Sequence, residues 1–329
     1  MNSKLLALIG GAALMATATA ASAQSYNMTI AGASPGGLWT LIGTGVDSAV
    51  KAAYPGSTIT YQTSGGGIAN VALLDQKRVQ LGIIHDVELK DAQDGKPPFK
   101  APIKSMRVLA YMYDWSPQQL ILTKDFADKH GIKTFDDIIS KKAPVRMVLN
   151  RQGNIAATVG IALFEAAGAS MKDVESWGGR VIYAASAEQA DLLKDRRVDL
   201  MNNSLFVRHA SLLEVGQALP VVMLPISKGI IDKVSQQVGT IPYVVKGGSY
   251  PYQPQDVTTV SFGAAVVTND SMSEQEAYNL TKALVEQIDR IRGVHSSMKA
   301  LTPELMASLK VTPYHPGAVK LYKEKGLMK

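Results

Sequence analysis

The sequence contains no cysteine, which excludes a disulfide framework, a thiolate metal site and a cysteine nucleophile. Its five histidines are scattered and lack the spacing of metal ligands. No H-E-x-x-H, P-loop or proper G-x-G-x-x-G motif is present. No set of residues is arranged for a bond-making step. We therefore expect a protein that is not an enzyme and that carries no metal or cofactor.

Charged residues are also few, at 19%, and they form no basic block of the kind that binds nucleic acid. The formal charge of +6 is spread along the chain and suits an anionic small ligand slightly better than a cationic one. Apolar residues make up 46% of the 329 residues, enough for two globular domains of ordinary size. We expect a small-molecule ligand and no nucleic-acid partner.

Residues 1–23 have the pattern of a secretory signal peptide. Lys4 supplies positive charge, an apolar run covers 5–15, and Ala21-Ser22-Ala23 supplies small residues for cleavage. The mature chain is therefore expected to begin at Gln24. The apolar run is too short for a comfortable membrane span, with an uncleaved anchor as the alternative, and no later stretch is suited to one. The pattern predicts a soluble protein exported to the periplasm.

One nine-residue pattern occurs twice in the chain. Residues 73–81 are LLDQKRVQL, and residues 192–200, which lie 119 positions later, are LLKDRRVDL. The turn at Asn150 follows Gly32 by 118 positions, so nearly the same offset relates two turns. A chance match of one helix end is the simpler explanation of the first pair alone. Two matches at nearly one offset favour a duplicated unit.

Hydrophobic periodicity predicts the order β-α-β-α-β in both copies. The first copy is expected to have strands over 26–33, 58–62 and 80–85 and helices over 38–53 and 67–77. The second is expected to have strands over 145–149, 180–184 and 199–202 and helices over 155–167 and 188–196. Short loops between such elements are typical of a parallel sheet with helices on both faces. The sequence thus predicts two doubly wound α/β lobes.

Two further segments are expected to join the lobes. The strand-like run within Met106–Thr123 leads into the second lobe, and the apolar strand over 219–225 is placed to lead back. Lobe one is then discontinuous, with residues 24–113 and 226–329, and lobe two comprises 114–225. Two strands that join two lobes form a hinge with a cleft between them.

In a parallel sheet, ligands bind beyond the carboxyl ends of the strands. Four of the five loops expected there carry no acid, and several precede helices, whose unpaired N–H groups and dipoles attract anions. In any single loop, the Gly, Ser, Thr and Asn residues are explained by turns and helix caps. A set of such loops that faces one cleft favours a binding site. The loops are 34–37, 63–67, 85–86, 150–154 and 202–203.

Arg151 is the most specific candidate, because a guanidinium at a strand end can pair bidentately with a carboxylate. An ordinary surface arginine is the alternative. Trp39 and Trp115 are candidates for the cleft wall, although a core position is the better-supported role for Trp39. His85 and Asp86 adjoin at a strand end, where such a pair is more often structural than catalytic.

Gly32-Ala33-Ser34-Pro35-Gly36 matches G-x-S-x-G, follows a strand and precedes a helix, as a hydrolase nucleophile does. The oxyanion hole of such a site needs the backbone N–H of the residue after the serine. That residue is Pro35, which has no N–H. The pattern therefore argues against an exported serine hydrolase that uses Ser34.

The chain resembles the TAXI-type solute receptors, which are periplasmic components of some TRAP transporters. The resemblance covers almost the whole mature chain, and the order of its segments is more specific than any one of them. The segments are GASPGGLWTLIGTGV, TSGGGIANVALL, LGIIHDVELKDAQDG, GIKTFDDI, RRVDLMNNSLFVRHASLLEV, IPYVVKGGSYPYQ, VTTVSFGAAVVTN and YHPGAVKLYKEKG.

This resemblance implies a type II periplasmic binding-protein fold that closes on a small organic anion and presents it to a membrane permease driven by an ion gradient. Family ligands include acidic amino acids and dicarboxylates. Carried over to the matching turns, the family's ligand contacts are Gly37, Trp39, Thr40, Ser64, Gly67, Asn70 and Asp86. With the loop analysis, the candidate ligand-binding set is Ser34, Gly36, Gly37, Trp39, Thr40, Ser64, Gly67, Asn70, Asp86, Arg151, Asn154 and Asn203.

In lobe two the sequence departs from the family, because residues 150–154 replace a glycine-rich turn that ends Ser-Gly-Thr. The departure puts glutamate itself in doubt and leaves another carboxylate, including an aromatic acid, open. We expect a monomer. Three alternatives also stay open: a receptor for an ATP-driven importer of sulfonates or pyrimidines, the hydrolase that uses Ser34, and a sensor subunit that serves a membrane kinase.

Overall fold

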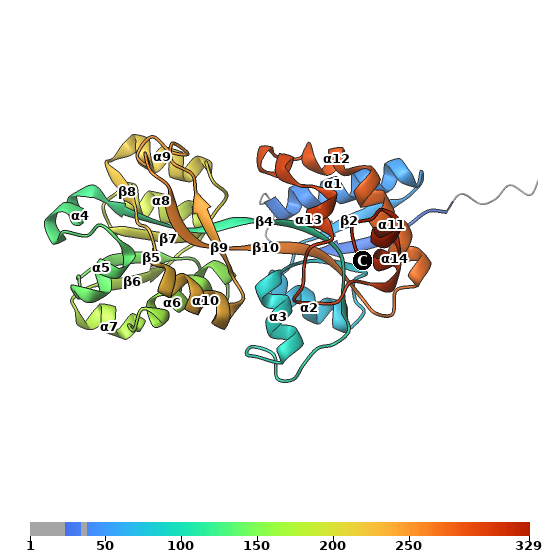
Figure 1. The fold of residues 1–329 in the computed structure, drawn as a ribbon, viewed down its shortest axis with the longest axis horizontal. Helices are drawn as coiled ribbons and strands as arrows, with labels where there is room; N and C mark the ends of the chain where they lie inside the picture. The colour runs from blue at the N-terminus through green and yellow to red at the C-terminus, as the bar shows by residue number, and fades with distance from the viewer. Residues whose placement is uncertain (1–23, 34–37) are drawn as a thin grey trace, which may run out of the picture.

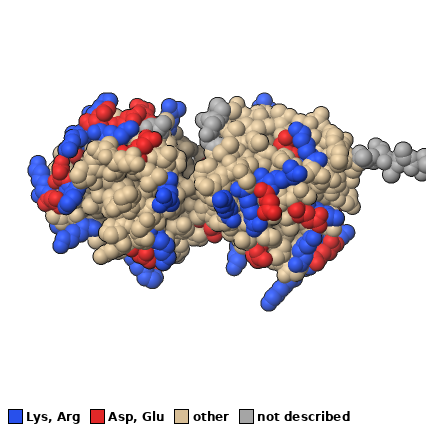
Figure 2. Space-filling model, turned by 90° about the horizontal axis from the view of Figure 1, so that it is seen from above, with Lys and Arg blue, Asp and Glu red and all other residues tan. Residues whose placement is uncertain are grey.

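The computed structural model describes residues 24–33 and 38–329. Figure 1 shows two lobes at the two ends of a pair of long strands, and Figure 2 shows a waist between them when the molecule is seen from above. The predicted signal peptide and the candidate residues Ser34, Gly36 and Gly37 lie outside the described residues.

The first lobe is built on a parallel β-α-β-α-β unit. Its elements are β1 (Asn27–Ala31), α1 (Leu38–Ala53), β2 (Thr58–Gln62), α2 (Gly67–Asp75), β3 (Leu81–His85) and the following α3 (Asp86–Asp94). β1 pairs in parallel with both neighbours, giving the order β2-β1-β3. Along α1, Ile42, Val46 and Val50 recur at helical spacing, and all three are buried.

Helices from the end of the chain complete this lobe. These elements are α11 (Glu274–Glu286), α12 (Ile288–Arg292), η1 (Ser296–Ala300), α13 (Pro303–Met306) and α14 (Pro316–Glu324). α11, α12 and α14 share a hydrophobic core with α1, while α2 and α3 pack in a separate core with residues of β3, β4 and β10. Gln287, with φ of −106° and ψ of 25°, separates α11 from α12.

The second lobe repeats the plan of the first. Its central unit is β5 (Arg146–Leu149), α6 (Ile155–Ala166), β6 (Arg180–Tyr183), α8 (Ser186–Lys194) and β7 (Leu200–Ser204). The other elements are α4 (Lys124–His130), α5 (Phe135–Ser140), α7 (Met171–Ser176), α9 (Ala210–Ala218), β8 (Val221–Met223), α10 (Lys228–Val238) and β9 (Ile241–Val245). β5 pairs in parallel with β6 and with β7, so β6-β5-β7 corresponds to β2-β1-β3.

The two nine-residue repeats have the same backbone conformation. Lys77 and Arg196 occupy the same position in the repeat, and both have positive φ, 56° and 57°. A non-glycine residue rarely adopts this conformation. The next residue closes the same helix-ending hydrogen bond in each copy, from Arg78 N to Leu73 O and from Arg197 N to Leu192 O. The match in sequence is therefore also a match in structure, which supports a duplicated unit.

Two long antiparallel strands, β4 (Met106–Thr123) and β10 (Val257–Asn269), run between the lobes (Figure 1). In the first lobe, β10 lies antiparallel beside β3. In the second lobe, β4 lies antiparallel beside β7. Each sheet is thus completed by one of the two crossing strands, and the same backbone ladder belongs to both lobes.

The pairing of β8 and the contacts of α10 favour another place for the return from the second lobe than 219–225. β8 pairs with β4 inside the second lobe, and the chain then continues into α10. Ile226 and the α10 residues Ile230 and Val234 belong to the same core as α6. We therefore propose that the chain returns within β10, and that residues from 226 to the first half of β10 belong with the second lobe. An apolar strand such as 219–225 does not by itself indicate which lobe it joins.

A bulge interrupts the pairing of β10 with β4 around Gly263. Any Cβ at this position would overlap the carbonyl oxygen of Tyr113 and the hydroxyl of Tyr111. The Gly263 N–H donates a hydrogen bond of 2.9 Å to the buried carboxylate of Asp86. The bulge therefore depends on glycine and brings three elements together in the middle of the crossing.

We predict that Gly263→Ala lowers the free energy of unfolding by about 1–3 kcal/mol, because the added methyl group has no space. Gly229→Ala in α10 is the matched control, since a Cβ there meets no atom within 4 Å. Chemical denaturation of both variants measures the difference. Equal stability of the two variants would contradict this account of the bulge.

Candidate functional site

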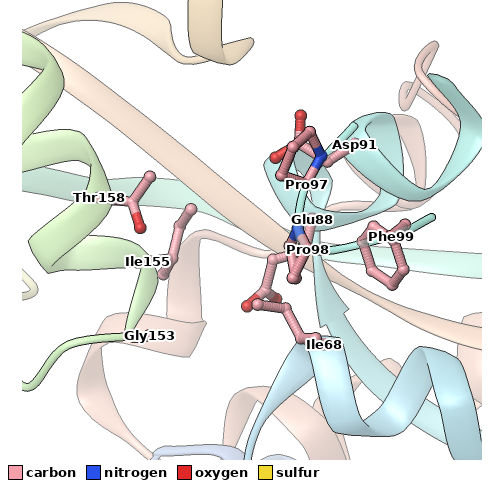
Figure 3. Close-up of a pocket in the computed structure, with 9 residues that line it drawn as sticks. All are labelled: Ile68, Glu88, Asp91, Pro97, Pro98, Phe99, Gly153, Ile155 and Thr158. Atoms are coloured by element: carbon pink, nitrogen blue, oxygen red, sulfur yellow. The ribbon is translucent and has the colours of Figure 1, made fainter. Parts of the chain in front are cut away.

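The carboxyl ends of the strands of the two lobes face a shared groove. A pocket of about 60 Å³ lies in this groove and is lined by both lobes (Figure 3). The first lobe contributes Ile68, Glu88, Asp91, Pro97, Pro98 and Phe99, and the second contributes Gly153, Ile155 and Thr158. A molecule held here touches α2 and α3 on one side and the start of α6 on the other.

Two candidate residues of the first lobe, Ser64 and Asn70, hold the loop before α2 in place. The Ser64 hydroxyl accepts a hydrogen bond from Gly66 N–H and lies 2.7 Å from the carbonyl oxygen of Gly32 and 2.6 Å from Oδ1 of Asn70. Asn70 is fully buried, and its Nδ2 donates to the carbonyl oxygens of Gly32 and Ile83, at 2.7 and 2.8 Å. These contacts tie the ends of β1 and β3 together and make both side chains positioning groups.

Gly67 allows the Glu88 carboxylate to approach the first turn of α2, because a Cβ at Gly67 would overlap that carboxylate. Oε2 of Glu88 lies 3.0 Å from Nδ1 of His85 and accepts from the His85 backbone N–H at 3.2 Å. This is a capping box at the start of α3. Glu88 lines the pocket with its carboxylate already engaged, so it shapes the wall on this side.

Trp39 is buried, as its core interpretation implied, and its indole Nε1 donates to the Tyr113 hydroxyl at 2.9 Å. The Trp39 ring also packs against the His85 imidazole with centroids 4.6 Å apart. Thr40, the next residue on α1, is partly buried, and its Oγ1 has no hydrogen-bond partner among the described residues. Of these two candidates, Thr40 is the one with a free hydrogen-bonding group.

Asp86 is buried at the crossing of β4 and β10. Its Oδ2 accepts from the Tyr111 hydroxyl at 2.5 Å and from Gly263 N–H, while its Oδ1 accepts from Val87 N–H at 2.8 Å. Burial raises the pKa of Asp86 to about 6, and the hydrogen bonds from Tyr111 and Gly263 oppose that rise. The carboxylate thus joins α3 to both crossing strands, and both of its oxygens accept hydrogen bonds from the protein.

In the second lobe, the candidate asparagines also have structural partners. Asn154 is the N-cap of α6, and its Oδ1 accepts from Ala156 N–H at 2.9 Å. Asn203 is buried, and its amide lies 3.1 Å from Asn150 Nδ2 and 3.1 Å from the Ser186 hydroxyl. These bonds fix the loops after β5 and β6, and they leave Ile155 N–H as the first-turn N–H of α6 without a partner among the described residues.

Arg151 lies exposed in the loop after β5, two residues before the pocket residue Gly153. Its backbone N–H donates to Oδ1 of Asn150 at 2.8 Å. Among the described residues, no carboxylate lies within ion-pair distance of its guanidinium. Arg151 is therefore available to an outside anion.

Sequence analysis missed three carboxylates that line the two pockets, which are Glu88, Asp91 and Asp114. Glu88 was detectable, because a glutamate three residues after the start of a helix is the signature of a capping box. Asp114 lies inside the apolar run of β4, and it lines a second pocket between the lobes. No local pattern marks Asp114, because its surroundings come from segments distant in the sequence. The groove thus contains more acidic residues than the sequence of its loops indicated.

The two lobes, the two crossing strands and the shared groove define a binding-protein architecture, and solved structures share it. A TctC solute-binding protein from Polaromonas aligns with a TM-score of 0.51 at 11% identity, over 83% of this chain and 88% of its own. The periplasmic binding protein BugD aligns with a TM-score of 0.52 at 13% identity, over 93% of this chain and 98% of its own.

MatC from Rhodopseudomonas palustris with bound malate aligns with a TM-score of 0.51 at 13% identity, over 92% of this chain and 97% of its own. At these identities the likeness establishes the fold, and the predicted type II periplasmic binding-protein fold is confirmed. Residues 30–326 match the NMT1-like family, and the chain belongs to that family. Within the described residues, no helix has the length and hydropathy of a membrane span.

The Asp86 carboxyl gives a prediction about pH. Its pKa is higher in the folded protein, about 6, than its ordinary value of 3.8, so the folded state binds the proton more tightly. The stability that this group contributes is full below pH 3.8 and is lost as the pH rises through 6. From pH 4 to pH 7, wild type should lose about 2–3 kcal/mol relative to Asp86→Asn. Urea denaturation of both proteins at each pH tests this, and a difference that does not change with pH would contradict it.

Proposed function

We propose that this protein is an exported solute receptor that captures a small organic anion between its lobes and delivers it to a membrane permease. The observation that carries the proposal is the pocket lined by both lobes, at the strand ends of a duplicated α/β fold. A ligand that contacts both walls stabilises the closed arrangement over the open one, because only the closed arrangement supplies all of its contacts. A non-enzymatic role follows from this mode of action.

The anion is proposed to bind at the start of α6, beside Arg151. The start of a helix carries a partial positive charge, and in α6 the Ile155 N–H has no partner among the described residues. α6 has 12 residues, and Gly153 and Ile155 at its beginning line the pocket. Arg151 adds a full charge and a planar set of donors that match a carboxylate. The candidates Thr40, Ser64 and Gly67 on the first lobe would complete the cage when the lobes close.

The transporter is proposed to be of the TRAP type with a TAXI-type receptor, on the strength of the sequence segments described above. The malate in MatC supports a carboxylate, since the two proteins share the fold. Export to the periplasm is supported by the pattern of residues 1–23. Uptake of the bound solute by cells should stop when an ionophore removes the ion gradient and should persist with vanadate. The opposite pattern would indicate an ATP-driven importer.

Calorimetry against mono- and dicarboxylates, amino acids and aromatic acids should detect at least one ligand. Arg151→Ala should then weaken its binding at least about tenfold, the loss expected for a charged hydrogen-bonded pair. Arg180→Ala is the matched control, because Arg180 is an exposed arginine at the other end of the same sheet. Equal affinity of both variants and wild type would remove Arg151 from the site, and no binding by any solute would contradict the receptor role.

A further inference from the structure

A second pocket between the lobes, of about 350 Å³, shares no lining residue with the first. Its walls come from four separate segments that meet beside the crossing strands. They are Asp114 and Trp115 of β4, Phe206 and Val207 after β7, Tyr243 of β9, and Ser297 and Ala300 of η1. Since η1 belongs to the first lobe and β9 to the second, this pocket also changes shape when the lobes move.

Among the described residues that line this pocket, Asp114 is the only charged one. Asp114 is partly buried, and among the described residues no cation lies within ion-pair distance of it and no group donates a hydrogen bond to it from another residue's side chain. Burial raises the pKa of Asp114, and only its own backbone N–H opposes the rise. A half-buried carboxylate without a partner costs free energy that a bound cation would offset.

Aromatic rings form much of the remaining wall. Trp115, Phe206 and Tyr243 are each partly exposed to the pocket, and the buried Tyr113 supports two of them from behind. The Tyr113 ring packs edge-on against Phe206 with centroids 5.4 Å apart and lies 6.3 Å from Trp115. Burial, and after it the charge of Asp114, raises the pKa of Tyr243, and both residues line this pocket.

A further group in this pocket also lacks a partner. The indole Nε1 of Trp115 is buried and has no hydrogen-bond acceptor among the described residues. A buried donor of this kind is usually paired, and here the acceptor has to come from outside the described protein. An ammonium group cannot accept from this N–H, so the indole would add to binding only for a cation that also carries an acceptor, such as the hydroxyl of choline.

We propose that this pocket binds a small organic ammonium ion, with Asp114 as its counter-ion and the three aromatic rings as its cage. The face of an aromatic ring attracts a cation, and rings that surround an ammonium group replace the water it gives up. The described lining of this pocket offers an anion the Asp114 carboxylate and no cation, whereas the first pocket lies beside Arg151. The proposal does not depend on the carboxylate site at α6, which uses other residues. A solute that binds here also contacts both lobes.

The test is isothermal titration of the full mature protein with tetramethylammonium and with choline, at constant ionic strength. The titration is run at pH 8, because burial raises the pKa of Asp114 and a higher pH favours its ionised form. Both cations should bind, and Asp114→Asn should weaken binding at least about tenfold, the size expected for a partly desolvated cation with its counter-ion. Asp128→Asn, which removes an exposed carboxylate of the same lobe, should leave binding unchanged.

Tyr243→Leu provides a second test that keeps the charge and removes one wall of the cage, and it should weaken tetramethylammonium binding several-fold. Thermal melting confirms that each variant is folded, and carboxylate titrations of the same proteins measure the proposed receptor function separately. The proposal is overturned if neither cation binds wild type, or if Asp114→Asn and Tyr243→Leu both bind tetramethylammonium as tightly as wild type does.

Discussion

The backbone pairing of β4 with β10 is the constraint on which both lobes depend. Each lobe has only three parallel strands of its own in its repeated unit, and a crossing strand covers the inner edge of each sheet. An uncovered inner edge would leave a row of unpaired N–H and C=O groups. The lobes therefore cannot separate without losing part of their own sheets. Their relative motion is limited to bending and twisting of the strand pair.

The pairing of β4 with β10 is irregular near the middle of the two strands. The pairing shifts register around Gly263, and the Asp86 carboxylate joins the bulge to α3 and to Tyr111. The carboxylate accepts hydrogen bonds from both strands, so a change in their crossing angle alters the geometry of these bonds. Because α3 begins at Asp86 and also lines the groove through Glu88, the crossing and the groove wall are mechanically connected.

Most polar side chains at the strand ends hold the loops rather than face the groove. Ser64 and Asn70 join β1 to β3, and Asn203 joins the loops after β5 and β6. This division of roles is physically reasonable, because a binding site needs loops of fixed shape before any group on them can select a ligand. Among the described residues, the groups left for a solute are the Ile155 N–H of α6, the Arg151 guanidinium, the Thr40 hydroxyl and, in the second pocket, Asp114 and its aromatic neighbours.

The sequence predicted the repeated units well, because their signals are local. Helical and strand periodicities, and the matching turns at Lys77 and Arg196, depend on neighbouring residues only. The return through β10 was not predictable in this way, because α10 joins the second lobe through contacts with α6 that no local pattern encodes. Contacts between segments distant in the sequence are also the reason why Asp114, which lies in a mostly apolar strand, was not predicted. They likewise explain why the hydrogen-bond partners of Asn70 and Asn203 were not predicted. For the candidate site, sequence indicated the loops but could not distinguish the side chains that hold them from those that remain available.

The central claim is that the two lobes close about the β4–β10 pair when a solute binds between them. Small-angle X-ray scattering of the mature protein, with and without a solute that calorimetry shows to bind, tests this claim most directly. The account predicts a smaller radius of gyration in the presence of the solute. A scattering profile that stays unchanged when the binding site is saturated would contradict it.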